Sequence, residues 1–496
     1  MPRTWSGSHG RARAKKLVHD DRPSRGVQGR IATRSLIVKG ALHALDRHVA
    51  LVGFMGAGKS TLGPALADRL GRPFVSIDAL VVERAGLSVT EVFETRGEPA
   101  FRELEEQAAL DALSRRPLAV IEIGGGGLAS AKTRAALEAH AFTLHLQTTA
   151  EEAWARVAGS GRPLARDRDV FEALFEERRP LYESADGTAR DLDDSVLASA
   201  GVRFAPHREA RGDALVADER VAELHGIQAA HSLPAGESAK TTAEAQRLWR
   251  ALRLERGSTL VAIGGGSTTD VAGFVAATYM RGVAWVPVPS TLVGQVDAAI
   301  GGKTGIDLPE GKNLVGAFHW PSETVIDTTL LSTLPGDELS NGRSEVVKSG
   351  LLAGDSIWNL ELSEQVRRCA AFKAAVCLRD PYERGERAQL NLGHTFAHAL
   401  EAASGYSLAH GRAVALGLLA ALRISDLEDE ARDVEEILQP HAVAVDRDAA
   451  WAALLRDKKT EAGSPRLVLL EAPGKPRLGV EVEPARVRAA LDALIA

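Results

Sequence analysis

The chain has 496 residues, which is too many for one hydrophobic core, so the sequence predicts two or three domains. Hydrophobic residues make up 45% and charged residues 25%, as in ordinary globular proteins, and the net charge of −6 excludes a global basic field for nucleic acid. The only cysteines, Cys369 and Cys377, cannot form a disulfide framework, so a reducing cytoplasm is expected. No apolar run is long enough to cross a bilayer, and no membrane partner is expected.

The first 47 residues differ in composition from the rest. They contain 11 Lys/Arg against 3 Asp/Glu, and they lack an apolar stretch of signal-peptide type. We interpret residues 1–47 as a basic, disordered extension or an overextended start of translation. An organelle transit peptide and a weak nucleic-acid contact are the alternatives.

From residue 48 the sequence alternates between strand and helix patterns. Short apolar runs at 48–51, 118–123 and 143–146 predict strands, and residues 61–70 predict a helix after a glycine-rich loop. This alternation predicts a parallel sheet covered by helices on both faces, in a domain that spans residues 48–192.

A second α/β pattern begins near residue 214. Apolar runs at 260–263 and 284–288 predict strands, so residues 213–329 are expected to form a Rossmann-like α/β domain. Beyond about residue 330 alanine and leucine recur at helical spacing, which predicts a helical domain over 330–496. Residues 193–212 have weak periodicity and mixed charge, and we place a linker there.

A phosphate-binding loop is predicted at residues 53–60. The segment G-F-M-G-A-G-K-S fits G-x-x-x-x-G-K-[ST] and lies between a predicted strand and a predicted helix, as this motif requires. Lys59 is expected to reach the β- and γ-phosphates of ATP, and the Ser60 hydroxyl to bind Mg²⁺. The predicted nucleotide-binding residues are Gly56, Gly58, Lys59, Ser60 and Thr61.

Several further motifs accompany this loop, and together they resemble shikimate kinase over about residues 49–191. The motifs are Asp78, G-L-S-V-T-E-V-F from Gly86, G-E-P-A-F-R from Gly97, four glycines from Gly124, R-P-L from Arg162 and R-R-P-L-Y from Arg178.

The resemblance implies a pocket for shikimate. Asp78 would hold ring hydroxyls and orient the attacking one, while Arg102 and Arg178 would bind the carboxylate through their two-pronged guanidinium groups. Arg162 would contact the transferring phosphate from a lid. Backbone at Gly124, Gly125 and Gly126 would approach the ring.

One position departs from the family pattern. Shikimate kinases carry an aspartate two residues before the Asp78 position that helps to hold the metal, and here that residue is Ser76. Glu83 and Glu122 are the nearest acids among the motifs, and neither is an obvious replacement. Kinase activity is therefore expected to be weakened or to depend differently on Mg²⁺. Another small polyol as substrate, or a degenerate kinase domain that acts only as a scaffold, are the alternatives.

The second half contains an apolar strand that ends in Gly264-Gly265-Gly266, which alone is a weak dinucleotide signal. More specific segments follow it, and their order resembles 3-dehydroquinate synthase over about residues 212–471. These segments begin at Asp270, Pro289, Gly301, Gly311, Glu345, Arg387 and His410.

Histidines of the second half indicate a metal site. His394 and His398 lie four apart on a predicted helix, so both project from one face and could bind a metal together. The resemblance instead implies Glu345, His394 and His410 as ligands of Zn²⁺ or Co²⁺, with His398 catalytic. Three ligands leave positions open for substrate hydroxyls. Packing of the histidines within helices is the alternative.

The resemblance implies further roles for residues of the second half. Arg281 would reach the site of a neighbouring subunit in a homodimer, and Asn313 with Lys458 or Lys459 would lie near substrate anions. The cofactor positions would be Asp218, Glu237, Lys240, Gly265, Gly266, Asp270, Thr291, Lys312 and Thr333. The positions around the reacting sugar would be Asp297, Lys303, Lys348, Lys373, Arg387, Asn391 and His398.

The reaction implied is cyclisation of 3-deoxy-D-arabino-heptulosonate 7-phosphate to 3-dehydroquinate with loss of phosphate, with NAD recycled rather than consumed. A sister cyclase that makes an inosose or valiolone is the main alternative. A metal-dependent polyol dehydrogenase, which would release NADH, is a further one.

Overall fold

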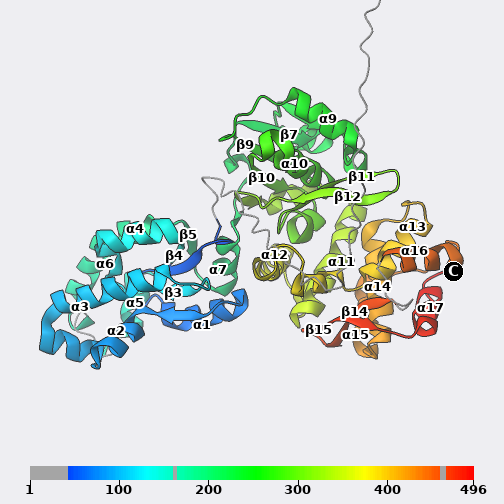
Figure 1. Cartoon of the computed structure of the whole chain (residues 1–496). Helices are drawn as coiled ribbons and strands as arrows, with labels where there is room; N and C mark the ends of the chain where they lie inside the picture. Colours follow the sequence, from blue (N-terminus) through cyan, green and yellow to red (C-terminus); the bar gives the residue numbers. More distant parts are fainter. Residues whose placement is uncertain (1–42, 160–164, 458–464) are drawn as a thin grey trace, which may run out of the picture. The chain divides into compact units, whose positions relative to one another are not determined.

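The computed structural model describes residues 43–159, 165–457 and 465–496 (Figure 1). The predicted basic extension therefore lies outside the described residues except for 43–47, as do Arg162, Lys458 and Lys459. Within the described ranges, no helix combines the length and apolarity that crossing a membrane would need.

The first domain is built on a five-stranded sheet of order β2-β3-β1-β4-β5, in which every pair is parallel. The strand β1 is buried at all of its positions, as expected for a strand covered on both faces. The elements are β1 (His48–Val52), α1 (Lys59–Leu70), β2 (Phe74–Ser76), α2 (Ile77–Ala85), α3 (Val89–Ser114), β3 (Val120–Glu122), α4 (Ala131–His140), β4 (Ala141–Leu146), α5 (Ala150–Val157), α6 (Arg168–Glu183) and β5 (Gly187–Ala189).

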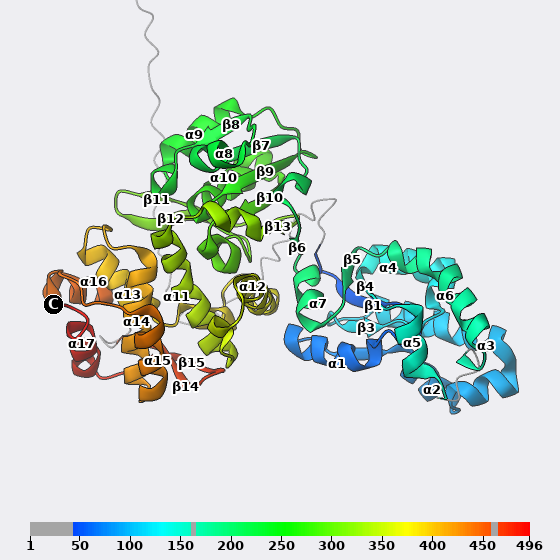
Figure 2. The same ribbon diagram turned by 180° about the vertical axis from the view of Figure 1, so that it is seen from behind.

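Alternate side chains of β1 enter different parts of the core, because successive residues of a strand point to opposite faces. Val49 and Leu51 pack in a cluster with Leu66 and Leu70 of α1. Ala50 and Val52 belong to a second cluster that includes side chains of α2, α3 and α6. Figure 2 shows β1 and β3 adjacent at the centre of this domain. The predicted parallel sheet with helices on both faces is confirmed.

Two short elements follow the first domain in the stretch that we expected to be a linker. These are α7 (Leu192–Ser199) and β6 (Val202–Phe204). The strand β6 pairs in parallel with β13 (Thr324–Ile326), which belongs to the second half of the chain. The backbone N–H of Thr324 also donates to the carbonyl of Gly201 at 2.7 Å.

The second α/β unit has a four-stranded parallel sheet of order β10-β9-β7-β8. An antiparallel hairpin of β11 and β12 follows it. The elements are β7 (Ala214–Asp218), α8 (Glu219–His225), β8 (His231–Leu233), α9 (Thr242–Ala251), β9 (Thr259–Gly264), α10 (Gly266–Thr278), β10 (Ala284–Pro289), β11 (Lys303–Leu308) and β12 (Gly311–Phe318).

The remaining chain is mainly helical, as predicted, and is organised around the almost fully buried helix α14. One segment is not helical. The buried apolar run of β14 pairs with β15 in an antiparallel hairpin. The elements are α11 (Gly336–Ala353), α12 (Leu362–Arg379), α13 (His394–Ala403), α14 (His410–Ile424), α15 (Glu428–Leu438), α16 (Arg447–Asp457), β14 (Arg466–Ala472), β15 (Lys475–Glu481) and α17 (Pro484–Asp492).

Candidate active sites

The predicted phosphate-binding loop joins β1 to α1. Gly56 and Gly58 have φ of 81° and 93°, which side chains rarely adopt, and a Cβ at Gly56 would lie 2.6 Å from the carbonyl oxygen of Ala153. Lys59 is buried, and its ammonium donates to the carbonyl oxygens of Gly53 at 2.6 Å and Phe54 at 3.0 Å. Its charge is thus held inside the loop where phosphates would bind.

The hydroxyl predicted to bind Mg²⁺ lies at the beginning of α1. Ser60 Oγ donates to the carboxylate of Glu122, the last residue of β3, at 2.6 Å. Thr61, the next residue of α1, is exposed. Ser76 caps α2, because its hydroxyl accepts from the N–H of Ala79 at 3.5 Å. The Ser60–Glu122 pair offers the hydroxyl and carboxylate oxygens that Mg²⁺ prefers.

Residues predicted for the acceptor pocket form an arginine–carboxylate cluster. Arg102 donates to the buried Glu105 at 2.7 Å and to Glu98 at 3.0 Å. A Cβ at Gly124 would lie 2.1 Å from Glu105 Oε1 and 3.2 Å from Asp78 Oδ1, so Asp78 belongs to the same cluster. Burial raises the pKa of Glu105, although the Arg102 charge opposes this effect.

The glycine run contacts a second arginine. Arg178 and Tyr182 of α6 both donate to the carbonyl oxygen of Gly125, at 3.2 and 2.5 Å. A Cβ at Gly126 would lie 2.2 Å from Arg102 Nη1, so a side chain at position 126 would displace the Arg102 guanidinium. Burial raises the pKa of Tyr182 to about 12, which keeps its phenol a neutral donor. The structure thus brings Asp78, Arg102, Arg178 and the glycines together.

Predicted cofactor residues of the second half gather where parallel strands of the second sheet end. Asp218 ends β7, Gly265 and Gly266 follow β9, and Thr291 follows β10. A Cβ at Gly265 would lie 3.1 Å from Thr291 Cγ2, so backbone and side chain are in close contact there. The carboxyl edge of such a sheet is where α/β proteins bind dinucleotides. Thr333 lies further along the chain and hydrogen bonds with His225 at 2.8 Å.

Lys240 is the centre of a charged cluster beside this edge. Its buried ammonium donates to Asp270 at 3.0 Å and to Asn313 at 2.5 Å, and lies 3.8 Å from Asp307. The structure therefore places Asn313 with predicted cofactor residues. Burial raises the pKa of Asp270, and Lys240 opposes this rise. Two more predicted cofactor residues form an ion pair nearby, since Lys312 lies 3.3 Å from Glu237.

The predicted metal ligands converge from three helices. Donor atoms of Glu345 on α11, His394 on α13 and His410 on α14 all lie within 4.8 Å of one another. Glu345 Oε1 lies 3.6 Å from His394 Nε2 and 3.3 Å from His410 Nε2. His398, one turn after His394, contacts the His394 ring at a centroid distance of 5.6 Å. Two imidazoles and a carboxylate are a donor set that fits a catalytic zinc or cobalt ion.

The charges around the triad act differently on its two histidines. Burial opposes the charged form of His410, but hydrogen bonds and charges from Glu345 and Glu401 raise its pKa to about 10, so a bound metal would displace that proton. Burial and the neighbouring Lys348 lower the pKa of His394 to about 3, so its imidazole is neutral and able to bind a cation. Glu345 is completely buried and forms an ion pair with Lys348, three residues later on α11. Glu401 Oε1 lies 3.3 Å from His410 Nδ1 and orients the ring from its other side.

Cationic side chains predicted to surround the sugar are paired with acids. Lys373 donates to the backbone oxygen of Asp297 at 2.7 Å and to its carboxylate at 2.6 Å. Lys303 forms an ion pair with Glu383, which also accepts from Asn391 at 3.2 Å. Burial lowers the pKa of Lys303, and the pairing with Glu383 opposes this shift.

Arg387 is the most deeply buried of these cations, with 1% of its surface exposed. Its Nη1 donates to the carbonyl of Pro381 at 2.9 Å, while its buried Nε has no hydrogen-bond partner among the described residues. An unsatisfied buried donor on a guanidinium is costly.

Six acids contact predicted site residues and were not themselves predicted for the sites: Glu98, Glu105, Glu122, Asp307, Glu383 and Glu401. Two of them had a local signal, since Glu98 and Glu105 lie four residues before and three residues after Arg102 on a helix. Arg281, by contrast, is exposed in a turn with φ of 68°.

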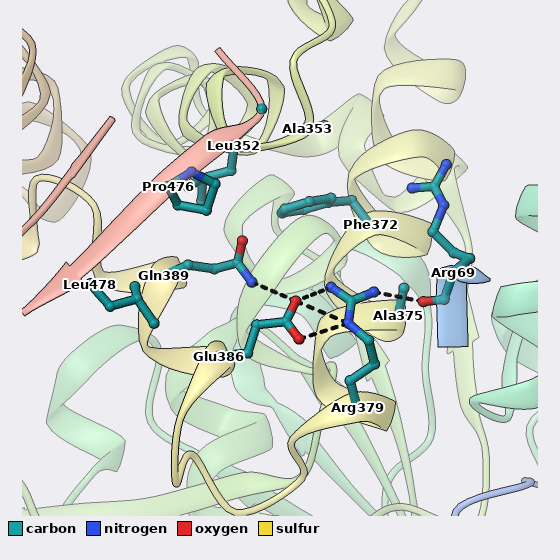
Figure 3. A pocket seen from close by; sticks show the side chains of 11 residues that line it. Arg69, Leu352, Ala353, Phe372, Ala375, Arg379, Glu386, Gln389, Pro476 and Leu478 are labelled. Carbon is teal, nitrogen blue, oxygen red and sulfur yellow. Dashed lines mark hydrogen bonds and ion pairs between the residues drawn. The ribbon is translucent and has the colours of Figure 1, made fainter. Parts of the chain in front are cut away.

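A cavity of about 340 Å³ lies outside both groups of predicted residues (Figure 3). Arg379 at the end of α12 is held there by Glu386 and donates to the backbone oxygen of Arg69 at 2.6 Å. Gln389 also donates to Glu386, at 3.1 Å. Glu386 directly precedes Arg387, so this cavity borders the second site without including its predicted residues.

The two sites define the classes of protein to which this chain belongs. A P-loop with an arginine–carboxylate cluster in the same domain is typical of a nucleotide-dependent phosphotransferase. A glycine-ended parallel strand near a Glu–His–His triad defines an enzyme that uses a dinucleotide and a metal. The family models agree, with shikimate kinase matching residues 55–200 and the N-terminal and C-terminal models of 3-dehydroquinate synthase matching 230–341 and 342–460.

Curated relatives give the same result, and a solved structure of a sister cyclase shares the fold of the second half. The bifunctional shikimate kinase/3-dehydroquinate synthase of Thermotoga maritima is 31% identical over 90% of this chain and 100% of its own length. The 3-dehydroquinate synthase of Symbiobacterium thermophilum is 40% identical over 65% of this chain and 99% of its own. The 2-epi-5-epi-valiolone synthase of Streptomyces hygroscopicus subsp. jinggangensis, solved with NAD⁺ and Zn²⁺, is 26% identical, covering 59% of this chain and 96% of its own with a TM-score of 0.52. The chain belongs to the bifunctional shikimate kinase/3-dehydroquinate synthase family.

Proposed function

We propose that the first domain transfers the γ-phosphoryl group of ATP to shikimate, and that the second half converts 3-deoxy-D-arabino-heptulosonate 7-phosphate to 3-dehydroquinate. The observation that carries this proposal is that one relative with both activities aligns over 90% of the chain, across both sites. Both halves keep the polar groups that these reactions need.

In the kinase, Lys59 binds the phosphates and Asp78 orients the attacking hydroxyl. Arg102 and Arg178 bind the shikimate carboxylate, and Glu105 holds Arg102 in place. Phosphoryl transfer depends on position and positive charge more than on covalent help from the protein, which suits this group of side chains.

In the synthase, Glu345, His394 and His410 hold a divalent metal, which polarises substrate oxygens when bound. NAD bound at the edge of the second sheet supplies reversible hydride transfer. Lys303, Lys373 and Arg387 bind the carboxylate and phosphate of the sugar, and the pairing of the two lysines with acids keeps their charges positioned before substrate arrives. His398, beside His394, holds or moves a proton during phosphate loss.

We further propose that the chain works in the cytoplasm as a homodimer. The support is an exposed Arg281 in a left-handed turn, which is free to extend toward a second copy, and two buried cysteines that remain reduced thiols.

The experiment that tests the kinase proposal is ADP formation from ATP and Mg²⁺ by the purified chain, with and without shikimate. We expect a shikimate-dependent rate that falls at least about a hundredfold in Lys59→Ala, because the β- and γ-phosphates lose their cation. Dehydroquinate formation by the same Lys59→Ala preparation serves as the control and should be unchanged. An ADP-forming rate that is indifferent to shikimate would overturn this assignment.

A further inference from the structure

A carboxylate that the family pattern leads us to expect on one strand is present on the neighbouring strand. Ser76 is the last residue of β2 and Glu122 the last residue of β3, and these two residues are register partners across the parallel pair. Side chains at the same level of neighbouring strands point to the same face. The Glu122 carboxylate therefore lies one strand away from position 76, where the family pattern has its acid, and at the same edge of the sheet.

The offset brings the carboxylate toward the phosphate-binding loop. The strand β3 lies between β2 and β1, and Glu122 is also the register partner of Leu51, two residues before the loop begins at Gly53. Glu122 is 9% exposed, and its carboxylate accepts a 2.6 Å hydrogen bond from Ser60 Oγ. P-loop enzymes bind Mg²⁺ through such a hydroxyl and an acid on an adjacent strand.

We propose that Glu122 supplies the acidic oxygen of the kinase Mg²⁺ site, together with the Ser60 hydroxyl, in place of the acid missing at Ser76. This inference deepens the proposed function and rests on its nucleotide-binding part alone. It also removes the reason to expect a weakened kinase, because the carboxylate has moved rather than disappeared.

The position of Ser76 is compatible with such an exchange. Its hydroxyl caps α2, a role that aspartate fills equally well, so neither residue is demanded there by the fold. Glu83, the other acid near these motifs, is exposed on α2 and provides a matched control.

The competing explanation is that Glu122 only stabilises the beginning of α1. A carboxylate near a helix N-terminus is favourable without any metal, and it could fix the Ser60 rotamer. The two explanations predict different effects of Mg²⁺ on nucleotide affinity. A residue that only stabilises the helix contributes equally to that affinity with and without the ion.

The test is binding of a fluorescent ADP analogue to the full chain, once with Mg²⁺ and once with EDTA, in the absence of shikimate. Mg²⁺ increases nucleotide affinity, and we expect this increase to be about tenfold or more smaller in Glu122→Gln than in the unchanged chain. The affinity of Glu122→Gln in EDTA should stay unchanged. Glu83→Gln should keep the full gain. The exchange Ser76→Asp with Glu122→Ser should restore the gain, which also separates loss of the acid from loss of folding.

Two results would overturn the inference in protein that still makes dehydroquinate. One is a normal Mg²⁺ gain in Glu122→Gln. The other is an equal loss of affinity with Mg²⁺ and with EDTA, which would assign Glu122 to the helix instead. Because the binding test contains no shikimate, its outcome does not depend on whether shikimate is the substrate. If Glu122 proves not to bind Mg²⁺, shikimate-dependent ADP formation still tests the proposed kinase activity separately.

Discussion

Glu401 supports the metal triad from behind. Its side chain is 6% exposed, and Oε1 lies 3.3 Å from Nδ1 of His410, the nitrogen that faces away from the other ligands. We predict that Glu401→Gln weakens Zn²⁺ affinity about tenfold to a hundredfold, because an outer partner fixes the ring and raises its basicity. Competition with a chromophoric chelator measures this directly. Glu436→Gln, a change of an exposed acid on α15, is the control, and equal affinities in the two variants would contradict the assignment.

Individual residues differ in how far the sequence predicted them. A short motif predicted Lys59 and Ser60 because its spacing on a loop carries the chemistry, whereas the family resemblance, and not helical spacing, implied the ligand set that contains His394. Glu122 and Glu401 act through contacts with Ser60 and His410 that only the sheet register and helix packing create. Nothing in the neighbouring sequence indicates that either acid belongs to a site. Only the structure identifies these carboxylates, through their contacts with the predicted residues.

At the scale of elements, the packing of α13 on α14 positions two of the three metal ligands. A Cβ at Gly417 would lie 2.1 Å from the carbonyl oxygen of Gly393, the residue directly before His394. We predict that Gly417→Ala lowers the free energy of unfolding by roughly 1–3 kcal/mol, because overpacking forces the helices apart. Zn²⁺ affinity should fall as well, since the displaced helix carries His394.

Denaturant unfolding of the zinc-free chain checks the first effect, and chelator competition checks the second. Gly336→Ala is the matched control, because a Cβ there meets no atom within 4 Å. If Gly417→Ala unfolds like this control, the two helices are not held at contact distance by their glycines.

Strands and helices were predictable where their pattern was unambiguous. The strands β1, β9 and β10 are short apolar runs that end in, or are followed by, glycine or proline, and the structure confirms them. The strand β14 was missed because Leu467–Leu470 is buried at every position, and a fully apolar run has no period that separates a strand from a buried helix. Its partner strand is fixed by pairing, which the sequence does not display.

At the scale of the whole molecule, each predicted site is built from its own part of the chain. Every kinase residue lies before α7, and every synthase residue lies after β6. The hydrophobic core is not divided in this way between the two parts of the chain. Val196 and Leu197 of α7 belong to one cluster with Leu66 of α1 and Val366 of α12. Arg367 adds hydrogen bonds to Asp191 and Asp194, each at 3.1 Å.

Separate expression of residues 1–200 and 201–496 should therefore leave both chemistries intact while lowering the stability of each half. We expect shikimate-dependent ADP formation and dehydroquinate formation to persist, because no site loses a residue. Melting temperatures should fall by several degrees, because each half exposes apolar surface that the intact chain buries. The intact chain and an equimolar mixture of the halves are the controls. Equal melting temperatures would show that the shared cluster adds no stability, whereas loss of either activity would mean that fusion supports catalysis directly.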